Sequence, residues 1–273
     1  MKYLAMSLFG TVLLGGCATA IAEAPADVAA PEAAPATDTV VEPAVGDVTK
    51  LARALAAAET RSDEDKARDP GRKPAEVLAY LGLKTGDTAA DFIASGGWYT
   101  EVLSIAVGPG GRVYAQNSEA ALALRERAYD KALTARLAGD RLANVVRKDE
   151  ELAALTIPAG SVDVALTGLN FHDVYNAYGP DAAVGFLSAI RATLRPGGVL
   201  GVIDHAGMPG ADNNELHRID PALAVASAEA AGFSVDMNSD ILASPADDHT
   251  KNVFDEALRG QTDRFILKLI NPE

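Results

Sequence analysis

The sequence predicts an α/β domain with a seven-stranded, mostly parallel sheet, helices on both faces and an antiparallel pair closing one edge. Two observations lead to this class. Short apolar segments alternate with amphipathic, helix-like segments from residue 50 onward, and strand–helix repetition builds a parallel sheet through right-handed crossovers. The last two strand-like segments, 233–242 and 263–270, are instead joined by a long polar insertion with no helix of crossover length. They are expected to pair antiparallel.

The individual elements follow from hydrophobic periodicity and from turn residues. The expected strands before the closing pair are 87–93, 111–116, 144–148, 161–169 and 197–205. The expected helices are 51–58, 74–83, 98–107, 118–137, 181–194 and 221–232. Pro74 suits the first turn of its helix, while Pro196 and the glycines after it end the helix before the fifth strand.

Residues 1–16 are interpreted as a lipoprotein signal peptide. Lys2 precedes an apolar run from Leu4 to Leu14, which is short for a membrane-spanning helix and has the layout of an export signal. Leu14-Gly15-Gly16-Cys17 resembles the lipobox of bacterial lipoproteins. The resemblance implies that Cys17 is lipidated and that the chain is exported and anchored to a membrane, facing the periplasm. An ordinary secretory signal with an incidental cysteine is the alternative.

Composition divides the rest of the chain into a tether, 17–47, and one domain, 48–273. The tether is Ala, Pro and acid with few large side chains, so it cannot bury enough apolar surface to offset its ordering entropy. Cys17 is the only cysteine, which excludes an internal disulfide and a thiolate metal cluster. The net charge of −14 argues against nucleic acid as a partner. The sequence leaves the oligomeric state open.

The segment from Asp91 to Thr100 is a candidate cofactor turn. It follows a buried strand and opens a helix, the place where Rossmann-like domains bind nucleotide-like ligands through small residues and helix N–H groups. Ile93 and Ser95 stand where a glycine-rich template has glycine. A purely structural strand–helix turn is the alternative. The candidate cofactor-binding residues of this turn are Asp91, Ala94, Ser95, Gly96, Gly97 and Tyr99. Trp98 and Tyr99 could wall the pocket or anchor the helix.

Three further polar residues follow the later strands. Asn117 stands where an acid usually accepts the ribose hydroxyls, although it could instead share a helix N-cap with Ser118. Asp149 could accept the adenine amino group or cap a short helix. Asn170 follows the fourth strand at an abrupt change from apolar to polar residues, where burial is costly unless the polar group is paired or used.

These segments together resemble the class I S-adenosylmethionine-dependent methyltransferases. The resemblance extends from about Ala75 to Ile270 and rests on DFIASGGWYTEVL, GRVYAQN, DVALTGLNFHD and LRPGGVLGVIDH. The most similar subgroup is that of exported predicted methyltransferases, through HRIDP and DRFILK. That subgroup tends to have Pro-Gly-Gly-Gly where this chain has Ala94-Ser95-Gly96-Gly97. The resemblance implies S-adenosylmethionine as the cofactor and an unknown, small-molecule substrate.

Methyl transfer needs alignment and sometimes proton removal, with no metal and no covalent intermediate. The candidate catalytic residues are His172, Asp173 and His205, because histidine titrates near neutral pH and these residues end the fourth and fifth strands. His172 is the first candidate for the base, with Asp173 as its orienting acceptor. His217 and Arg218 could contact an anionic substrate group. The histidines could also be structural, and Arg218 could form a surface salt bridge.

The sequence therefore favours a methyltransferase that works outside the cytoplasm. The alternative is a non-catalytic binding protein that retains the fold, since the turn has lost glycines and the cofactor is made in the cytoplasm. A nicotinamide oxidoreductase shares the Rossmann-like beginning. The poor glycine template and the late antiparallel pair argue against it.

Overall fold

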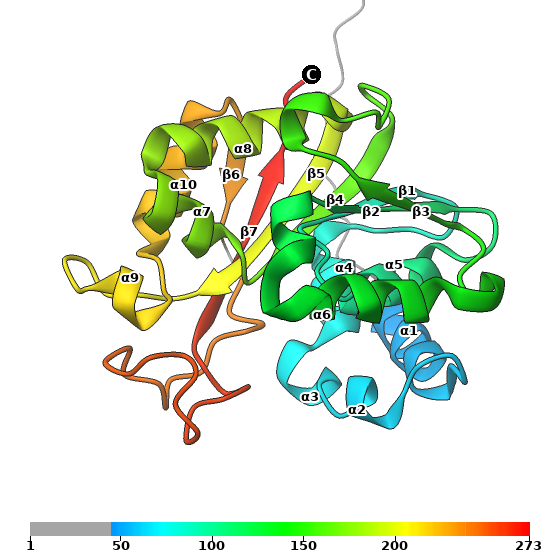
Figure 1. The fold of residues 1–273 in the computed structure, drawn as a ribbon, viewed down its shortest axis with the longest axis horizontal. Helices are drawn as coiled ribbons and strands as arrows, with labels where there is room; N and C mark the ends of the chain where they lie inside the picture. Colours follow the sequence, from blue (N-terminus) through cyan, green and yellow to red (C-terminus); the bar gives the residue numbers. More distant parts are fainter. Residues whose placement is uncertain (1–44, 238) are drawn as a thin grey trace, which may run out of the picture. The chain divides into compact units, whose positions relative to one another are not determined.

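A seven-stranded sheet forms the centre of the protein, as seen in the computed structural model, which describes residues 45–237 and 239–273 (Figure 1). The strand order is β3-β2-β1-β4-β5-β7-β6. Strands β1 to β5 are parallel, whereas β7 is antiparallel to both β5 and β6. The strands are β1 (Thr88–Phe92), β2 (Arg112–Asn117), β3 (Val145–Asp149), β4 (Val162–Gly168), β5 (Leu194–His205), β6 (Ser234–Asp236) and β7 (Arg264–Ile270). The predicted α/β class and its antiparallel closing pair are confirmed.

Ten α-helices surround this sheet in the described part of the chain. They are α1 (Val45–Ala57), α2 (Asp63–Lys66), α3 (Asp69–Arg72), α4 (Pro74–Leu81), α5 (Trp98–Val107), α6 (Glu119–Leu137), α7 (Phe171–Tyr178), α8 (Pro180–Thr193), α9 (Asn213–Leu216) and α10 (Pro221–Ala230). The described residues contain no helix with the length and apolar character needed to cross a membrane. The predicted signal peptide, Cys17 and most of the predicted tether lie outside the described residues, and α1 begins three residues before the predicted domain boundary at 48.

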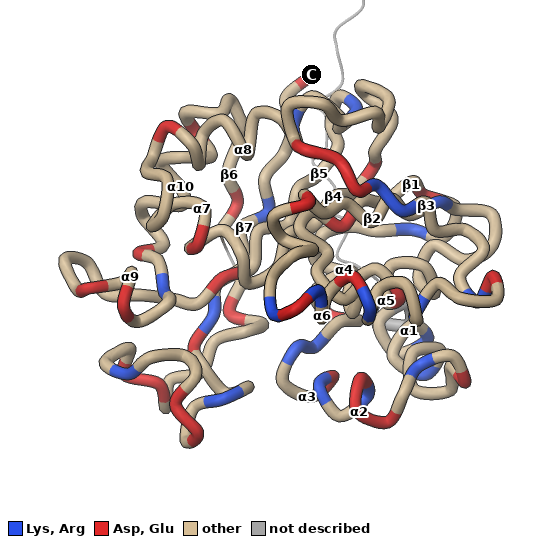
Figure 2. The backbone as a smooth tube through the Cα atoms, in the orientation of Figure 1, with Lys and Arg blue, Asp and Glu red and all other residues tan. Residues whose placement is uncertain are grey.

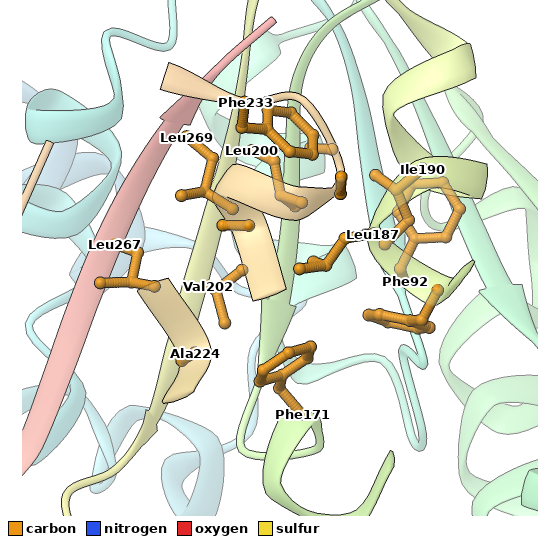
Figure 3. Close-up of a cluster of buried hydrophobic side chains, with 14 of the residues drawn as sticks. Phe92, Phe171, Leu187, Ile190, Leu200, Val202, Ala224, Phe233, Leu267 and Leu269 are labelled. Carbon is orange, nitrogen blue, oxygen red and sulfur yellow. The ribbon is translucent and has the colours of Figure 1, made fainter. Parts of the chain in front are cut away.

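Successive side chains along the strands point to opposite faces of the sheet and pack into two large apolar cores, one on each face. Ala90 and Ala165 face one core, with Phe171 and side chains of α8 and α10. Figure 3 shows part of this core, with Leu187 between Val202 and Phe92 and with Ile190 beside Phe92. Ala89 and Val164 face the opposite core, which α1, α4 and α5 complete. Helices therefore cover both faces, as predicted, and the carboxyl ends of the parallel strands form one edge of the domain.

Two predicted elements differ from the structure. The segment 118–137 was expected to be one helix, but Leu124 and the left-handed residues Arg125, Glu126 and Arg127 interrupt α6. The strand expected over 233–242 is only the short β6. Beyond it, Ser239 and Asp240 favour turns over strand pairing, and the chain continues as an irregular insertion until β7.

Candidate functional site at the carboxyl ends of the strands

The turn after β1 adopts a backbone conformation that glycine normally provides. Ile93 has φ of 53° and Ser95 has φ of 52°, and Gly97 follows with φ of 81°. The two non-glycine residues are those that replace glycine in the sequence template. Each left-handed non-glycine residue costs about 1–2 kcal/mol. The turn therefore keeps a glycine-like path under strain, and strain of this kind needs contacts that hold it.

The end of β2 supplies those contacts. Asn117 Oδ1 accepts a hydrogen bond from the Ser95 amide at 2.8 Å, and Asn117 Nδ2 donates to the Ser95 carbonyl at 3.3 Å. The Ala94 amide donates to the Gln116 carbonyl at 2.9 Å. The sequence predicted that Asn117 would present an acceptor to a ribose. Its side chain is fully buried and positions the turn instead.

A second clamp comes from α6. Arg136 Nε donates to the Gly96 carbonyl at 3.0 Å, and its guanidinium forms ion pairs with Asp65 and with the fully buried Glu101. Nothing in the sequence distinguished Arg136 from the other basic residues of an Ala-rich helix. Its role depends on how α6 lies against the turn.

The clamped turn borders a cavity of about 690 Å³, within the range of small-molecule and cofactor sites. Segments far apart in the sequence line it: the region from α2 to α3, the turn, the broken α6, and the β4–α7 junction. Predicted site residues on its lining are Asp91, Ala94, Ser95, Gly96, Tyr99, Asn170, His172, Asp173 and His205. Ile93 and Trp98 also line the cavity but do not fill it. The strand ends thus converge on a space large enough for a nucleoside-sized ligand.

Asp91 provides a buried carboxyl group at the end of β1. The Thr100 hydroxyl donates to it at 2.7 Å. Burial raises the pKa of Asp91 to about 7, although the hydrogen bonds from Thr100 and the charges of Arg72 and Arg136 oppose this rise. A carboxyl group of this kind gains from a cationic ligand group placed beside it.

His172 is the second residue of α7 and lies directly beside the end of β5. Its Nδ1 lies 2.7 Å from Asp204 Oδ1, and its amide donates to Asp204 Oδ2 at 2.7 Å. Its Nε2 lies 3.3 Å from Asp173. Burial alone lowers the pKa of His172, but the charges of Asp204 and Asp173 and their hydrogen bonds raise it to about 10. His172 is therefore protonated at neutral pH, and Asp204, not the predicted Asp173, is its main orienting acceptor.

His205 lies beside His172, with ring centroids 5.9 Å apart, because β4 and β5 are neighbouring parallel strands. Its Nδ1 is 2.9 Å from the Thr262 hydroxyl. Burial, together with the positive charges of His172, Arg264 and Arg218, lowers the pKa of His205 to about 4, against the opposing charge of Asp204. Its imidazole is neutral at neutral pH. In the tautomer that donates from Nδ1 to Thr262, Nε2 is free to accept a proton.

Asn170, Asp149 and Gly97 have different surroundings. Asn170 Nδ2 donates to the carbonyls of Ile93 at 3.2 Å and Gly168 at 2.8 Å, so it ties the β4 end to the turn. Asp149 forms an ion pair with Arg147 and lies off the cavity lining, as does Gly97 at the helix N-cap.

The two predicted substrate-binding residues, His217 and Arg218, have different environments. Arg218 is fully buried and forms a two-bond ion pair with Asp247, so its guanidinium holds the insertion instead of contacting a substrate. His217 remains partly exposed, with its Nδ1 3.6 Å from Asp173. The surface salt bridge considered for Arg218 is therefore a buried one. In the same insertion, His249 Nε2 lies 2.9 Å from Asp263.

One group of described residues has the spacing of a metal site. Ligand atoms of His172, Asp173 and His217 lie within 4.8 Å of one another, and two imidazoles with one carboxylate form a donor set that divalent transition metals accept. The same groups also satisfy one another, since protonated His172 donates to Asp173.

The fold is similar to that of solved methyltransferase structures. A SAM-dependent methyltransferase from Aquifex aeolicus is 20% identical with a TM-score of 0.55, covering 82% of this chain and 98% of that chain. A chain from a complex of the Haloferax volcanii Trm112 methyltransferase activator is 17% identical with a TM-score of 0.52, covering 84% and 97%. No protein-family model and no curated protein matches the sequence. The chain has the Rossmann-like fold of these methyltransferases.

Proposed function

We propose that the protein is an S-adenosylmethionine-dependent methyltransferase acting on a small molecule. The observation that carries the proposal is the cavity beside the strained turn, where Asp91, His172 and His205 converge. Its size and its buried carboxyl group fit a nucleoside that carries a cationic amino acid. The fold shared with solved methyltransferases supports the same assignment.

The cofactor supplies an activated sulfonium methyl group, and the protein residues align and deprotonate the acceptor. His205 is the neutral imidazole at the strand ends, so we assign proton removal to His205 in preference to His172. The protonated His172 donates its two ring N–H groups to Asp204 and Asp173, so its contribution is a fixed positive charge beside the acceptor. In-line transfer then depends on holding the acceptor near the methyl group.

Isothermal titration with S-adenosylhomocysteine, the demethylated cofactor, tests the binding step. We expect saturable binding that Asp91→Asn weakens and that Asp149→Asn leaves unchanged, because Asp149 lies off the cavity. No binding at millimolar ligand would overturn the proposal.

A non-catalytic binding protein is the second candidate, favoured by the strain at Ile93 and Ser95 and by the burial of Asn117. A single comparison separates the two candidates. An enzyme loses its cellular function in His205→Ala and His172→Ala, whereas a binding protein that has abandoned catalysis keeps it in both variants.

We also propose that the chain is exported and anchored through Cys17, as the exported subgroup would be. The signal-like run and the lipobox-like sequence support this location. Labelling of the expressed full chain with a radioactive fatty acid should be lost in Cys17→Ser. Persistent labelling of that variant would contradict the anchor.

A further inference from the structure

A second cavity, of about 830 Å³, adjoins the first and has a different chemical character. Five arginines line it: Arg68, Arg72, Arg125, Arg259 and Arg264. None of the lining residues is Asp or Glu. The protein carries a net charge of −14, and Figure 2 shows acidic residues on many of the elements around the sheet. The lining of this cavity is therefore positively charged although the protein as a whole is negatively charged, and it creates a local positive field.

Among the described residues, four of these arginines, all except Arg68, have no carboxylate within ion-pair distance. Arg264 and Arg72 are the more buried of the four. Arg264 is 8% exposed, and its guanidinium donates to the carbonyls of Gly71 at 2.6 Å and Thr262 at 3.3 Å. The Arg72 guanidinium lies over the Trp98 ring, 4.5 Å from its centroid. Burial lowers the pKa of both groups. Buried charges are usually paired because an unpaired one is costly, so an anion in this cavity would relieve that cost.

Stacking on Trp98 does not use the in-plane N–H groups of Arg72. A guanidinium that stacks on an aromatic face can still bind a carboxylate or phosphate through two parallel hydrogen bonds. Arg68 differs, since its guanidinium is bonded to the exposed Glu64 at 2.7 Å. The cavity therefore contains the buried guanidinium of Arg264, the stacked guanidinium of Arg72 and the more exposed one of Arg68, all of which can bind an anion.

The location connects this cavity to the candidate chemistry. His205 lines both cavities, as do Leu169, Val253 and Phe254, which form an apolar wall. Phe254 is 50% exposed despite its aromatic ring. A ligand with its anionic group among the arginines would place an apolar body along this wall and its far end beside His205.

We propose that the arginine cavity binds the anionic group of the methyl-accepting substrate, a small molecule with a carboxylate or phosphate on an apolar body. This substrate class rests on the proposed function, but the anion site itself can be tested alone. Sequence reasoning assigned anion contact to Arg218, which is buried elsewhere. The clustering of arginines from α3 and its N-cap, α6, the insertion and β7 depends on tertiary structure.

The experiment measures binding of benzoate, phenyl phosphate and neutral benzamide to the full chain by isothermal titration, with and without saturating S-adenosylhomocysteine. Arg259→Met and Arg264→Met are the test variants, because these two arginines line only the second cavity. Arg195→Met is the matched control, since Arg195 pairs with Asp163 near the start of β4. Thermal unfolding of each variant identifies loss of fold.

We expect at least one of the two anions to bind, benzamide to bind at least tenfold more weakly, and affinity to fall at least tenfold in Arg259→Met but not in the control. If Arg264→Met does not fold, Arg259→Met and the benzamide comparison still decide. Equal affinity for benzoate, phenyl phosphate and benzamide, or unchanged affinity in Arg259→Met, overturns the anion site. If benzoate binds more tightly, the anionic group of the substrate is a carboxylate. If phenyl phosphate binds more tightly, it is a phosphate.

The outcomes also separate this inference from the proposed function. Binding of S-adenosylhomocysteine without arginine-dependent anion binding leaves the methyltransferase proposal standing and removes the substrate class. Arginine-dependent anion binding without cofactor binding retains an anion site in a protein that is not a methyltransferase.

Discussion

At the residue scale, two neighbouring histidines differ in charge at neutral pH, because their surroundings differ: His172 is protonated and His205 is neutral. His172 faces two carboxylates, whereas His205 is buried beside a hydroxyl and near positive charges. Identical side chains at the ends of adjacent strands can thus act as a fixed positive charge and as a proton acceptor. The residues next to each histidine in sequence did not reveal this difference, because Asp204, which contacts His172, comes from the neighbouring strand β5.

Asp204→Asn tests the charge on His172. Loss of the carboxylate removes the charge and hydrogen bond of Asp204, while burial still lowers the pKa and Asp173 still raises it, so the pKa of His172 should fall from about 10 towards its ordinary value. NMR titration of the imidazole should find no titration of His172 between pH 5 and 9 in the wild type. In the variant, a ring still protonated at pH 9 would contradict this account.

The same pair predicts how stability depends on pH. A folded pKa raised above the unfolded value stabilises the folded state below pH of about 6.5, and this stabilisation declines as pH rises towards 10. Urea unfolding should find wild type more stable than Asp204→Asn at pH 6, with the difference smaller at pH 9.5. A difference that grows with pH would refute the assignment.

Asp91 predicts a pH dependence of cofactor binding. Its pKa of about 7 in the free protein should fall when the ligand ammonium group lies beside it. Affinity for S-adenosylhomocysteine should therefore rise between pH 5.5 and 7, by up to about tenfold per pH unit, and level off above pH 7. Asp91→Asn should flatten the profile measured by titration calorimetry; an unchanged slope would assign it to another group.

At the element scale, the turn after β1 combines glycine-like dihedral angles with close packing by α6. A Cβ at Gly97 would lie 2.7 Å from Leu133 Cδ1 on α6. Gly82, at the C-cap of α4, has nearly the same φ of 80° but has no atom within 4 Å of such a Cβ. A substitution at Gly82 would thus introduce backbone strain alone, whereas one at Gly97 would introduce both backbone strain and steric overlap.

Gly97→Ala should destabilise the fold more than Gly82→Ala. Both substitutions carry the left-handed cost of about 1–2 kcal/mol, and overlap with Leu133 should add about 1–3 kcal/mol at Gly97 only. Urea unfolding of the two variants measures the difference. Equal losses would mean that α6 yields without cost and does not constrain the turn.

At the scale of the whole molecule, the described residues from 45 onward belong to one compact unit. Residues 1–16 were predicted to be a signal peptide from their apolar run, and residues 17–47 a tether because they have few large side chains. Their removal should therefore leave the fold intact.

A chain beginning at residue 41 should have the same urea midpoint and slope as the full chain. The expected change in unfolding free energy is within about 0.5 kcal/mol, as for substitutions that touch no buried contact. A larger loss would show that the N-terminal residues pack against the domain.

The sequence alone determined the sheet class, the closing pair and the position of the turn, because hydrophobic period and turn chemistry are local properties. It also placed Asp91, His172 and His205 at strand ends, where parallel topology brings them together. Only the tertiary structure decided that Asn117 and Arg218 are buried, that Asp204 orients His172, and that the arginines share a cavity. Burial, charge pairing and pKa depend on neighbours from distant segments, which no local pattern specifies.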